Sequence, residues 1–151
     1  VEEEKIQALL EAAMSSPSAV GKDPWRFIVV RDKKKLKQIS EGLPNGQFLA
    51  DAPLGIVVCG DLKAAHGNQL SYMLQDCAAS IENLLLAVNA LGLGACWLGV
   101  HPREERVKHI TEICKVPEQV IPVSCISIGY PDEEKAARNR FDPDKVHYDE
   151  W

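Results

Sequence analysis

Apolar residues recur along the 151-residue chain with two spacings, which predict helices that alternate with strands. Ile6, Leu9, Leu10 and Ala13 fit one face of an amphipathic helix over residues 2–14. Runs of apolar and β-branched residues predict strands over residues 25–30, 54–59, 95–100 and 120–128. The other expected helices cover residues 33–41, with Asp32 as the cap, 69–91, and 102–114 with Pro102 in the first turn. This order predicts an α+β or three-layer α/β domain, in which helices flank a sheet of about four to five strands.

The expected helix over residues 69–91 is apolar on nearly every side in its second half, from Ile81 to Leu91. A helix that is buried all round needs a large core, and a chain of this length offers little room for one. We therefore expect a second copy of the chain to cover part of this helix. Glu82, Asn83 and Asn89 interrupt the apolar run, which favours a helix of a soluble protein over a membrane span.

Residues 132–151 show neither a helical nor a strand period, so we expect an irregular C-terminal arm. This segment contains Phe141, Val146, Tyr148 and Trp151. A disordered tail seldom carries so many large apolar residues, because it buries no surface. The arm is therefore expected to wrap over a neighbouring surface. No linker or repeat divides the sequence, and residues 1–151 are expected to form one domain.

Composition narrows the classes of function. The net charge of −5 and the isoelectric point of about 5.4 argue against a general nucleic-acid-binding protein, which needs a basic face. Five cysteines, an odd number without a Cys-x-x-Cys motif, predict buried and reduced thiols in a cytoplasmic protein. The four histidines are scattered, so no metal site is expected. No side chain stands out as a catalytic acid or base.

Two features are candidates for ligand binding. Gly99 ends an expected strand, where main-chain amides can approach a ligand closely. Arg138 and Arg140 are two residues apart in an acidic protein and could hold a phosphate, although a solvated polar tail would show the same spacing. The segment LGLGACWLG, residues 91–99, contains Gly-x-Gly, but its glycines close a helix instead of opening one. That context excludes a dinucleotide-binding fingerprint and predicts a helix-terminating turn at Gly92.

Four segments, taken together, resemble the FMN-dependent nitroreductase family, particularly its small single-domain members. They are PSAVGKDPW at residues 17–25, DCAASIENLLL at 76–86, LGLGACWLG at 91–99 and the ending RNRFDPDKVHYDEW. Each motif is weak alone, but all four occur in the family's order. The resemblance implies a nitroreductase-like fold, with a mostly antiparallel sheet and an intertwined homodimer built around the helix over residues 69–91.

The resemblance also implies how the chain would bind FMN. Pro17, Ser18 and Ala19, in a loop that includes Gly21, would contact the flavin ring system from the partner subunit. Trp25 would anchor the strand that follows this loop.

The remaining implied contacts come from three other segments. Leu98 and Gly99 would direct main-chain N–H groups at the N5 and O4 edge of the flavin. Arg138 and Arg140 would hold the FMN phosphate. Asn45 is a further candidate for the pyrimidine side of the ring.

The implied activity is a ping-pong oxidoreductase reaction, in which NAD(P)H delivers a hydride to FMN and a nitroaromatic, a quinone or a similar electron-poor small molecule is then reduced. The sequence departs from the family pattern at Gly21, where the family has Asn, and at Asp23, where it has Gln. The family's first, arginine-containing helix has no counterpart before Val1, so that segment is expected to be missing or omitted. These departures favour an alternative, a flavin-binding sensor or carrier without turnover. A third interpretation is an α/β interaction module that binds no flavin.

Overall fold

Four antiparallel strands form the centre of the structure, in the order β1-β2-β4-β3. They are β1 (Trp25–Val30), β2 (Leu54–Asp61), β3 (Gly94–Gly99) and β4 (Val120–Gly129). The structure is a computed structural model, and it describes residues 1–133 and 135–151. Since β1 and β3 are the edge strands, each keeps one side free of strand pairing. The expected mostly antiparallel sheet of about four to five strands is confirmed, and the described residues form it with four strands in antiparallel pairs.

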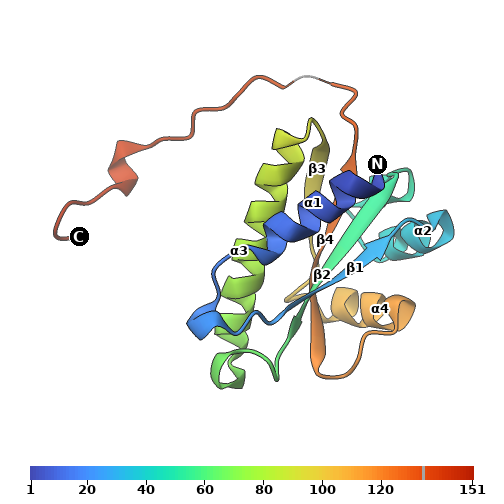
Figure 1. Cartoon of the computed structure of the whole chain (residues 1–151), viewed down its shortest axis with the longest axis horizontal. Coiled ribbons are helices and arrows are strands. Elements are labelled where there is room, and N and C mark those ends of the chain that lie inside the picture. Colours follow the sequence, from blue (N-terminus) through green and yellow to red (C-terminus); the bar gives the residue numbers. More distant parts are fainter. Residues whose placement is uncertain (134) are drawn as a thin grey trace.

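Two helices cover each face of this sheet, as Figure 1 shows. On one face, α1 (Glu3–Met14) packs against α3 (Leu70–Ala90), and α3 crosses the strands. On the other face lie α2 (Lys33–Glu41) and α4 (Glu104–Cys114). Each face has its own cluster of buried apolar side chains, so the molecule has the three layers that the sequence predicts.

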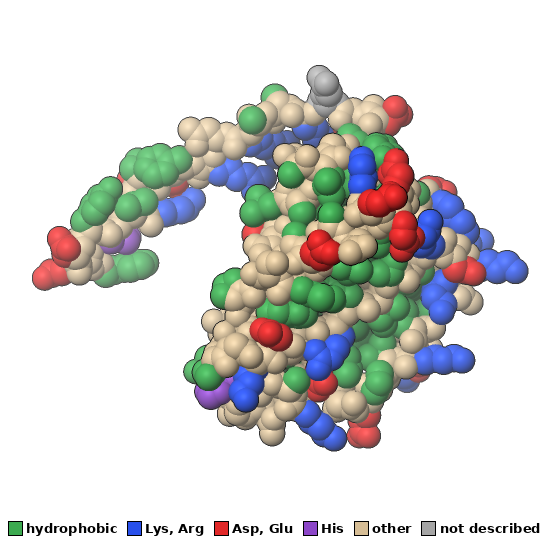
Figure 2. Space-filling view, viewed as in Figure 1, with side chains coloured by type: hydrophobic (Ala, Val, Ile, Leu, Met, Phe, Trp, Pro, Cys, Tyr) green, Lys and Arg blue, Asp and Glu red, His purple; other side chains and the backbone are tan. Residues whose placement is uncertain are grey.

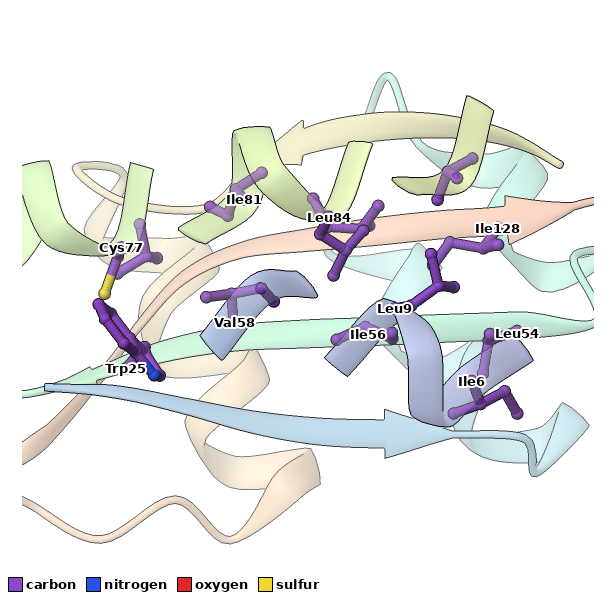
Figure 3. Close-up of a cluster of buried hydrophobic side chains, with 14 of the residues drawn as sticks. Ile6, Leu9, Trp25, Leu54, Ile56, Val58, Cys77, Ile81, Leu84 and Ile128 are labelled. Carbon is purple, nitrogen blue, oxygen red and sulfur yellow. The ribbon is translucent and has the colours of Figure 1, made fainter. Parts of the chain in front are cut away.

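The larger cluster lies between the sheet and the pair α1 and α3. In Figure 3, Ile6 and Leu9 of α1 and Ile81 and Leu84 of α3 point toward Leu54, Ile56, Val58 and Ile128 of the strands. Trp25, at the start of β1, lies beside Cys77 of α3 and is almost fully buried. The side chain of Trp25 therefore fixes the position at which the preceding loop enters the sheet.

Most expected elements are confirmed to within two residues. The Asp32 cap is confirmed, because its carboxylate accepts the Lys35 N–H at 2.9 Å. The expected position of Pro102 in the first helical turn is wrong: α4 begins at Glu104, with Arg103 as its N-cap residue. The prediction of buried thiols is also wrong for Cys96, which is exposed, and Cys114 is only partly buried. Cys96 lies on the edge strand β3, where fewer neighbours cover the sheet.

The C-terminal arm leaves the body at Tyr130 and extends away from it (Figure 1). The Tyr130 hydroxyl donates to the Glu2 carboxylate at 2.7 and 2.8 Å, and Lys5 donates to the same hydroxyl at 3.0 Å. The Tyr130 O–H lowers the pKa of the Glu2 carboxyl, because this hydrogen bond favours the ionised form. These contacts attach the base of the arm to α1. Beyond them, Phe141, Tyr148 and Trp151 are strongly exposed.

No helix in the described part of the chain is both long and apolar enough to cross a membrane.

Candidate functional site

A strained loop connects α1 to β1 and carries the predicted residues Pro17, Ser18, Ala19 and Gly21. Val20, Gly21 and Asp23 all have positive φ angles, of 55°, 62° and 48°. For Val20 and Asp23 such angles are costly, so other contacts must stabilise this backbone.

One of these contacts is a pair of hydrogen bonds between Ser18 and Asp23. The Ser18 hydroxyl donates to the Asp23 carboxylate at 2.5 Å and accepts the Asp23 N–H at 3.0 Å. The departure from the family pattern at Asp23 therefore has a local role: its carboxylate binds its own loop. The same bond restrains the Ser18 side chain.

A second contact ties the loop to α3. The Ala19 N–H donates to Oδ1 of Asp76 at 2.8 Å, across 57 positions of sequence. Asp76 is buried, and its Oδ2 has no hydrogen-bond partner among residues 1–133 and 135–151. Sequence reasoning missed Asp76, since a lone acidic residue in a long helix carries no distinctive pattern.

Gly99 ends the edge strand β3, and its main-chain groups point away from the sheet. The next residue, Val100, donates its N–H to the carbonyl of Val123 in β4 at 3.2 Å. In an antiparallel ladder successive residues alternate between facing the partner strand and facing away from it. The N–H and the C=O of Gly99 therefore face the open edge, while the Leu98 N–H faces β4. Of the two predicted main-chain donors, Gly99 is the one available to a ligand.

The surroundings of Gly99 leave room for a ligand. A Cβ atom placed on Gly99 would meet nothing within 4 Å. The Gly99 carbonyl accepts a hydrogen bond from Nη1 of Arg106, in α4, at 2.9 Å. Sequence reasoning missed Arg106 as well, because only the fold brings its side chain to the end of β3.

The loop that contains Asn45 packs on β3 beside Gly99. A Cβ atom on Gly46 would lie 2.8 Å from Cδ1 of Leu98, so the loop at Gly46 packs directly against the Leu98 side chain. The Leu98 side chain is buried under the loop, whereas Asn45 is exposed. The structure thus places Asn45, Leu98 and Gly99 in one region.

Arg138 and Arg140 lie in the arm, and both are exposed. Neither forms an ion pair or a side-chain hydrogen bond within the residues that the structure describes. Figure 2 shows Lys and Arg side chains along the arm, with hydrophobic side chains toward its end. Among residues 1–133 and 135–151, the two guanidinium groups therefore have no side-chain partner.

The predicted site residues thus form three groups in one chain: the Pro17–Gly21 loop, the Asn45, Leu98 and Gly99 region, and the arm. No described hydrogen bond or ion pair joins one group to another. A surface hollow of about 1040 Å³ at the base of the arm, lined by Phe48, Leu85, Leu93, Cys96 and Tyr130 among others, contains none of these residues. Within the described ranges no cluster of His, Cys, Asp and Glu could hold a metal ion.

Comparisons with known proteins decide the family. The family model described as "Nitroreductase family" matches residues 1–43 and 40–130. The chain belongs to the nitroreductase family. This nitroreductase-family chain is 46% identical to an Archaeoglobus fulgidus protein named as an NADH dehydrogenase/NAD(P)H nitroreductase, over all of this chain and 88% of that relative.

Solved nitroreductase structures have the same fold. An FMN-dependent nitroreductase from Clostridium difficile aligns with a TM-score of 0.91 and 38% identity, over 100% of this chain and 90% of the other. A nitroreductase-type structure from Desulfovibrio desulfuricans in complex with FMN aligns with a TM-score of 0.83 and 25% identity, over 100% and 87%. The nitroreductase-like fold that the four sequence motifs imply is confirmed.

Proposed function

We propose that this chain is an FMN-dependent oxidoreductase that passes reducing equivalents from NAD(P)H to a small electron-poor acceptor, such as a nitroaromatic or a quinone. Family membership supports this function, as do the names and bound cofactor of the relatives. The observation that carries the proposal in this molecule is Gly99, whose main-chain N–H has no partner among the described residues and lies at a sheet edge with open space beside it. FMN would supply the hydride chemistry.

The residues present fit FMN. Arg138 and Arg140, free of partners in their own chain as far as the structure describes it, would hold the phosphate through charge-assisted hydrogen bonds. The Gly99 N–H would donate to the N5 and O4 edge of the flavin and stabilise negative charge there. Leu98 would support this strand end through its buried side chain, and Asn45 would face the pyrimidine side.

The Pro17–Gly21 loop would cover the ring system from a second subunit. Ser18 and Ala19 are held by Asp23 and Asp76, so the loop has a defined shape before any ligand binds. A preformed loop loses less conformational freedom on binding, which strengthens affinity. The same loop would exclude water from the ring and orient both substrates on it in turn.

A homodimer is part of the proposal, because the three groups of site residues are separate within one chain. Some large apolar side chains on α3 are exposed, among them Leu86 at 62% and Tyr72 at 41%. Exposed apolar side chains of this size are typical of a protein interface. Phe141, Tyr148 and Trp151 are strongly exposed on the arm, which extends away from its own body (Figure 1), and another molecule would bury them. A second copy of the chain would cover both sets of side chains and would complete the site.

A visible spectrum tests this function. We expect purified protein mixed with FMN and passed through a desalting column to retain yellow colour, and to bleach when NADPH or NADH is added without oxygen. Retained colour without bleaching would support the alternative, a flavin-binding protein without turnover. A colourless protein that retains no FMN would contradict both.

A further inference from the structure

We propose that Arg106 is a positioning residue that keeps a positive charge next to the flavin-binding N–H of Gly99 and thereby stabilises the reduced form of FMN. This inference rests on the proposed function, and it adds a residue that neither the motifs nor the resemblance includes. The carrying observation is the 2.9 Å hydrogen bond from Nη1 of Arg106 to the Gly99 carbonyl.

The direction of the Gly99 main chain follows from two independent hydrogen bonds. On the β3 side, Val100 donates to Val123, so Gly99 turns away from β4. The second hydrogen bond lies between β1 and β2. Asp61, the last residue of β2, donates its N–H to the carbonyl of Pro24, which precedes β1, so the main chain of Asp61 faces β1. Alternation along β2 then turns Val58 toward Ser124 of β4. Ser124, the register partner of Gly99, therefore uses its main chain for β2, and Gly99 faces the open edge.

In an extended strand the N–H and the C=O of one residue point to the same side. The guanidinium that binds the Gly99 carbonyl must therefore lie beside any group that accepts the Gly99 N–H. The guanidinium lies close to any acceptor of the Gly99 N–H, whatever the orientation of the rest of the ligand. A flavin edge bound at Gly99 would have the Arg106 charge as a close neighbour.

The Arg106 guanidinium has no ion-pair partner in the part of the chain that the structure describes. Arg106 is partly buried, so water screens its charge less than that of a fully exposed side chain. Reduction adds negative charge to the flavin, and a nearby cation stabilises the product of that step.

A purely structural role of Arg106 would predict a different effect of substitution from an electrostatic role. If Arg106 only supports the end of β3, a neutral side chain that keeps a hydrogen-bond donor should replace it without any electrostatic effect. Arg106→Gln retains an N–H donor and removes the charge, whereas Arg106→Lys retains the charge. Arg103→Gln is the matched control, because Arg103 lies one turn earlier, is exposed, and makes no described side-chain hydrogen bond.

The experiment measures the midpoint potential of the FMN-loaded protein by anaerobic dye equilibration, together with FMN affinity by fluorescence quenching. For Arg106→Gln we expect the preference for reduced over oxidised FMN to fall roughly tenfold, which is a decrease of about 30 mV for a two-electron couple. For Arg106→Lys and Arg103→Gln we expect a change of less than about threefold.

An unchanged potential in Arg106→Gln, with FMN still bound, would overturn the role of Arg106 and leave the proposed function intact. An equal decrease in Arg103→Gln would also overturn it, because the effect would then follow net charge alone. If the wild-type protein binds no FMN, the proposed function fails and this inference fails with it. If Arg106→Gln does not fold, Arg106→Lys still tests the proposal. This variant retains the positive charge, so a midpoint potential that differs from that of the wild type would contradict the proposal.

Discussion

The Asp76 carboxylate of α3 accepts the main-chain N–H of Ala19 at 2.8 Å, and this bond joins the helix expected at the subunit interface to the loop expected over the cofactor. Asp76→Leu leaves the Ala19 N–H without an acceptor, which costs about 1–3 kcal/mol of folding stability. Asp76→Asn keeps an acceptor oxygen, and we expect it to lose about half as much. Urea unfolding of the three proteins measures the difference. Equal destabilisation by both variants would show that the charge matters and the bond to Ala19 does not.

The bond between Ser18 and Asp23 restrains a loop with three positive φ angles. Asp23→Ala removes the acceptor, and we expect FMN affinity to fall severalfold, because an exposed hydrogen bond contributes about 1 kcal/mol. Asp23→Asn keeps the acceptor and the tolerance of positive φ, so its affinity should stay close to that of the wild type. Lys22→Ala, at the adjacent exposed position, is the control for FMN titrations. Wild-type affinity in Asp23→Ala would contradict a role for this bond.

Arg138 and Arg140 are expected to bind the phosphate of FMN. Each Arg→Ala substitution should remove about 1.5–3 kcal/mol of binding energy, or roughly 10- to 150-fold in affinity. Riboflavin, which has no phosphate, serves as the matched ligand, and its affinity should be unaffected. Lys145→Ala is the control variant, because Lys145 lies in the same arm and pairs with Asp142 at 2.9 Å. Equal loss of FMN and riboflavin binding would mean that the arginines act on the fold of the arm.

The cysteines should differ sharply in reactivity. Burial raises the pKa of Cys59, Cys77 and Cys125 to about 12, so at pH 8 only about one thiol in ten thousand of these would be ionised. We expect a thiol reagent to modify exposed Cys96 rapidly in the native protein and to modify all five cysteines only after unfolding. Cys96→Ser should remove the rapid phase. A rapid phase that survives this substitution would contradict the burial pattern.

The same thiols predict the direction of a pH effect on stability. Their pKa values are higher in the folded protein than the ordinary thiol value of 9.0, because burial disfavours the thiolate, so folding favours the neutral thiol. This contribution is complete below pH 9 and declines between pH 9 and about pH 12, by about 1.4 kcal/mol per pH unit for each thiol. Denaturation at pH 8 and pH 10 should show a smaller decrease in a Cys77→Ala variant than in the wild type.

Much of the fold can be predicted from the spacing of apolar residues, because this spacing distinguishes helices from strands in this chain. The strand over residues 25–30 and the helix over 33–41 are confirmed at both ends, since Trp25, Asp32 and Gly42 mark their boundaries. Sequence spacing could not show the strand order, which depends on contacts between distant segments. It also could not show that Cys96 would lie exposed on an edge strand.

Less of the candidate site than of the fold could be predicted from the sequence. The motifs indicate Gly99, but only the ladder alternation shows that its N–H is free and that the Leu98 N–H is directed to β4. Asp76 and Arg106 act through single hydrogen bonds to main-chain atoms, which any acidic or basic residue could make. Such roles have no sequence signature, because the partner is a backbone group that every residue possesses.

The central claim is that two copies of the chain build each FMN site, with the Pro17–Gly21 loop from one copy and Gly99 from the other. Subunit mixing tests it directly. Gly99→Pro removes the open-edge N–H at a position where an edge strand tolerates proline, and Ala19→Trp fills the space over the expected ring. Each homodimer should retain no FMN. Heterodimers, co-expressed with two tags and purified through both, should retain one FMN per two chains, because one of their two sites contains neither change. Heterodimers that retain no FMN would place the loop and Gly99 of one site in the same copy, and would contradict the account.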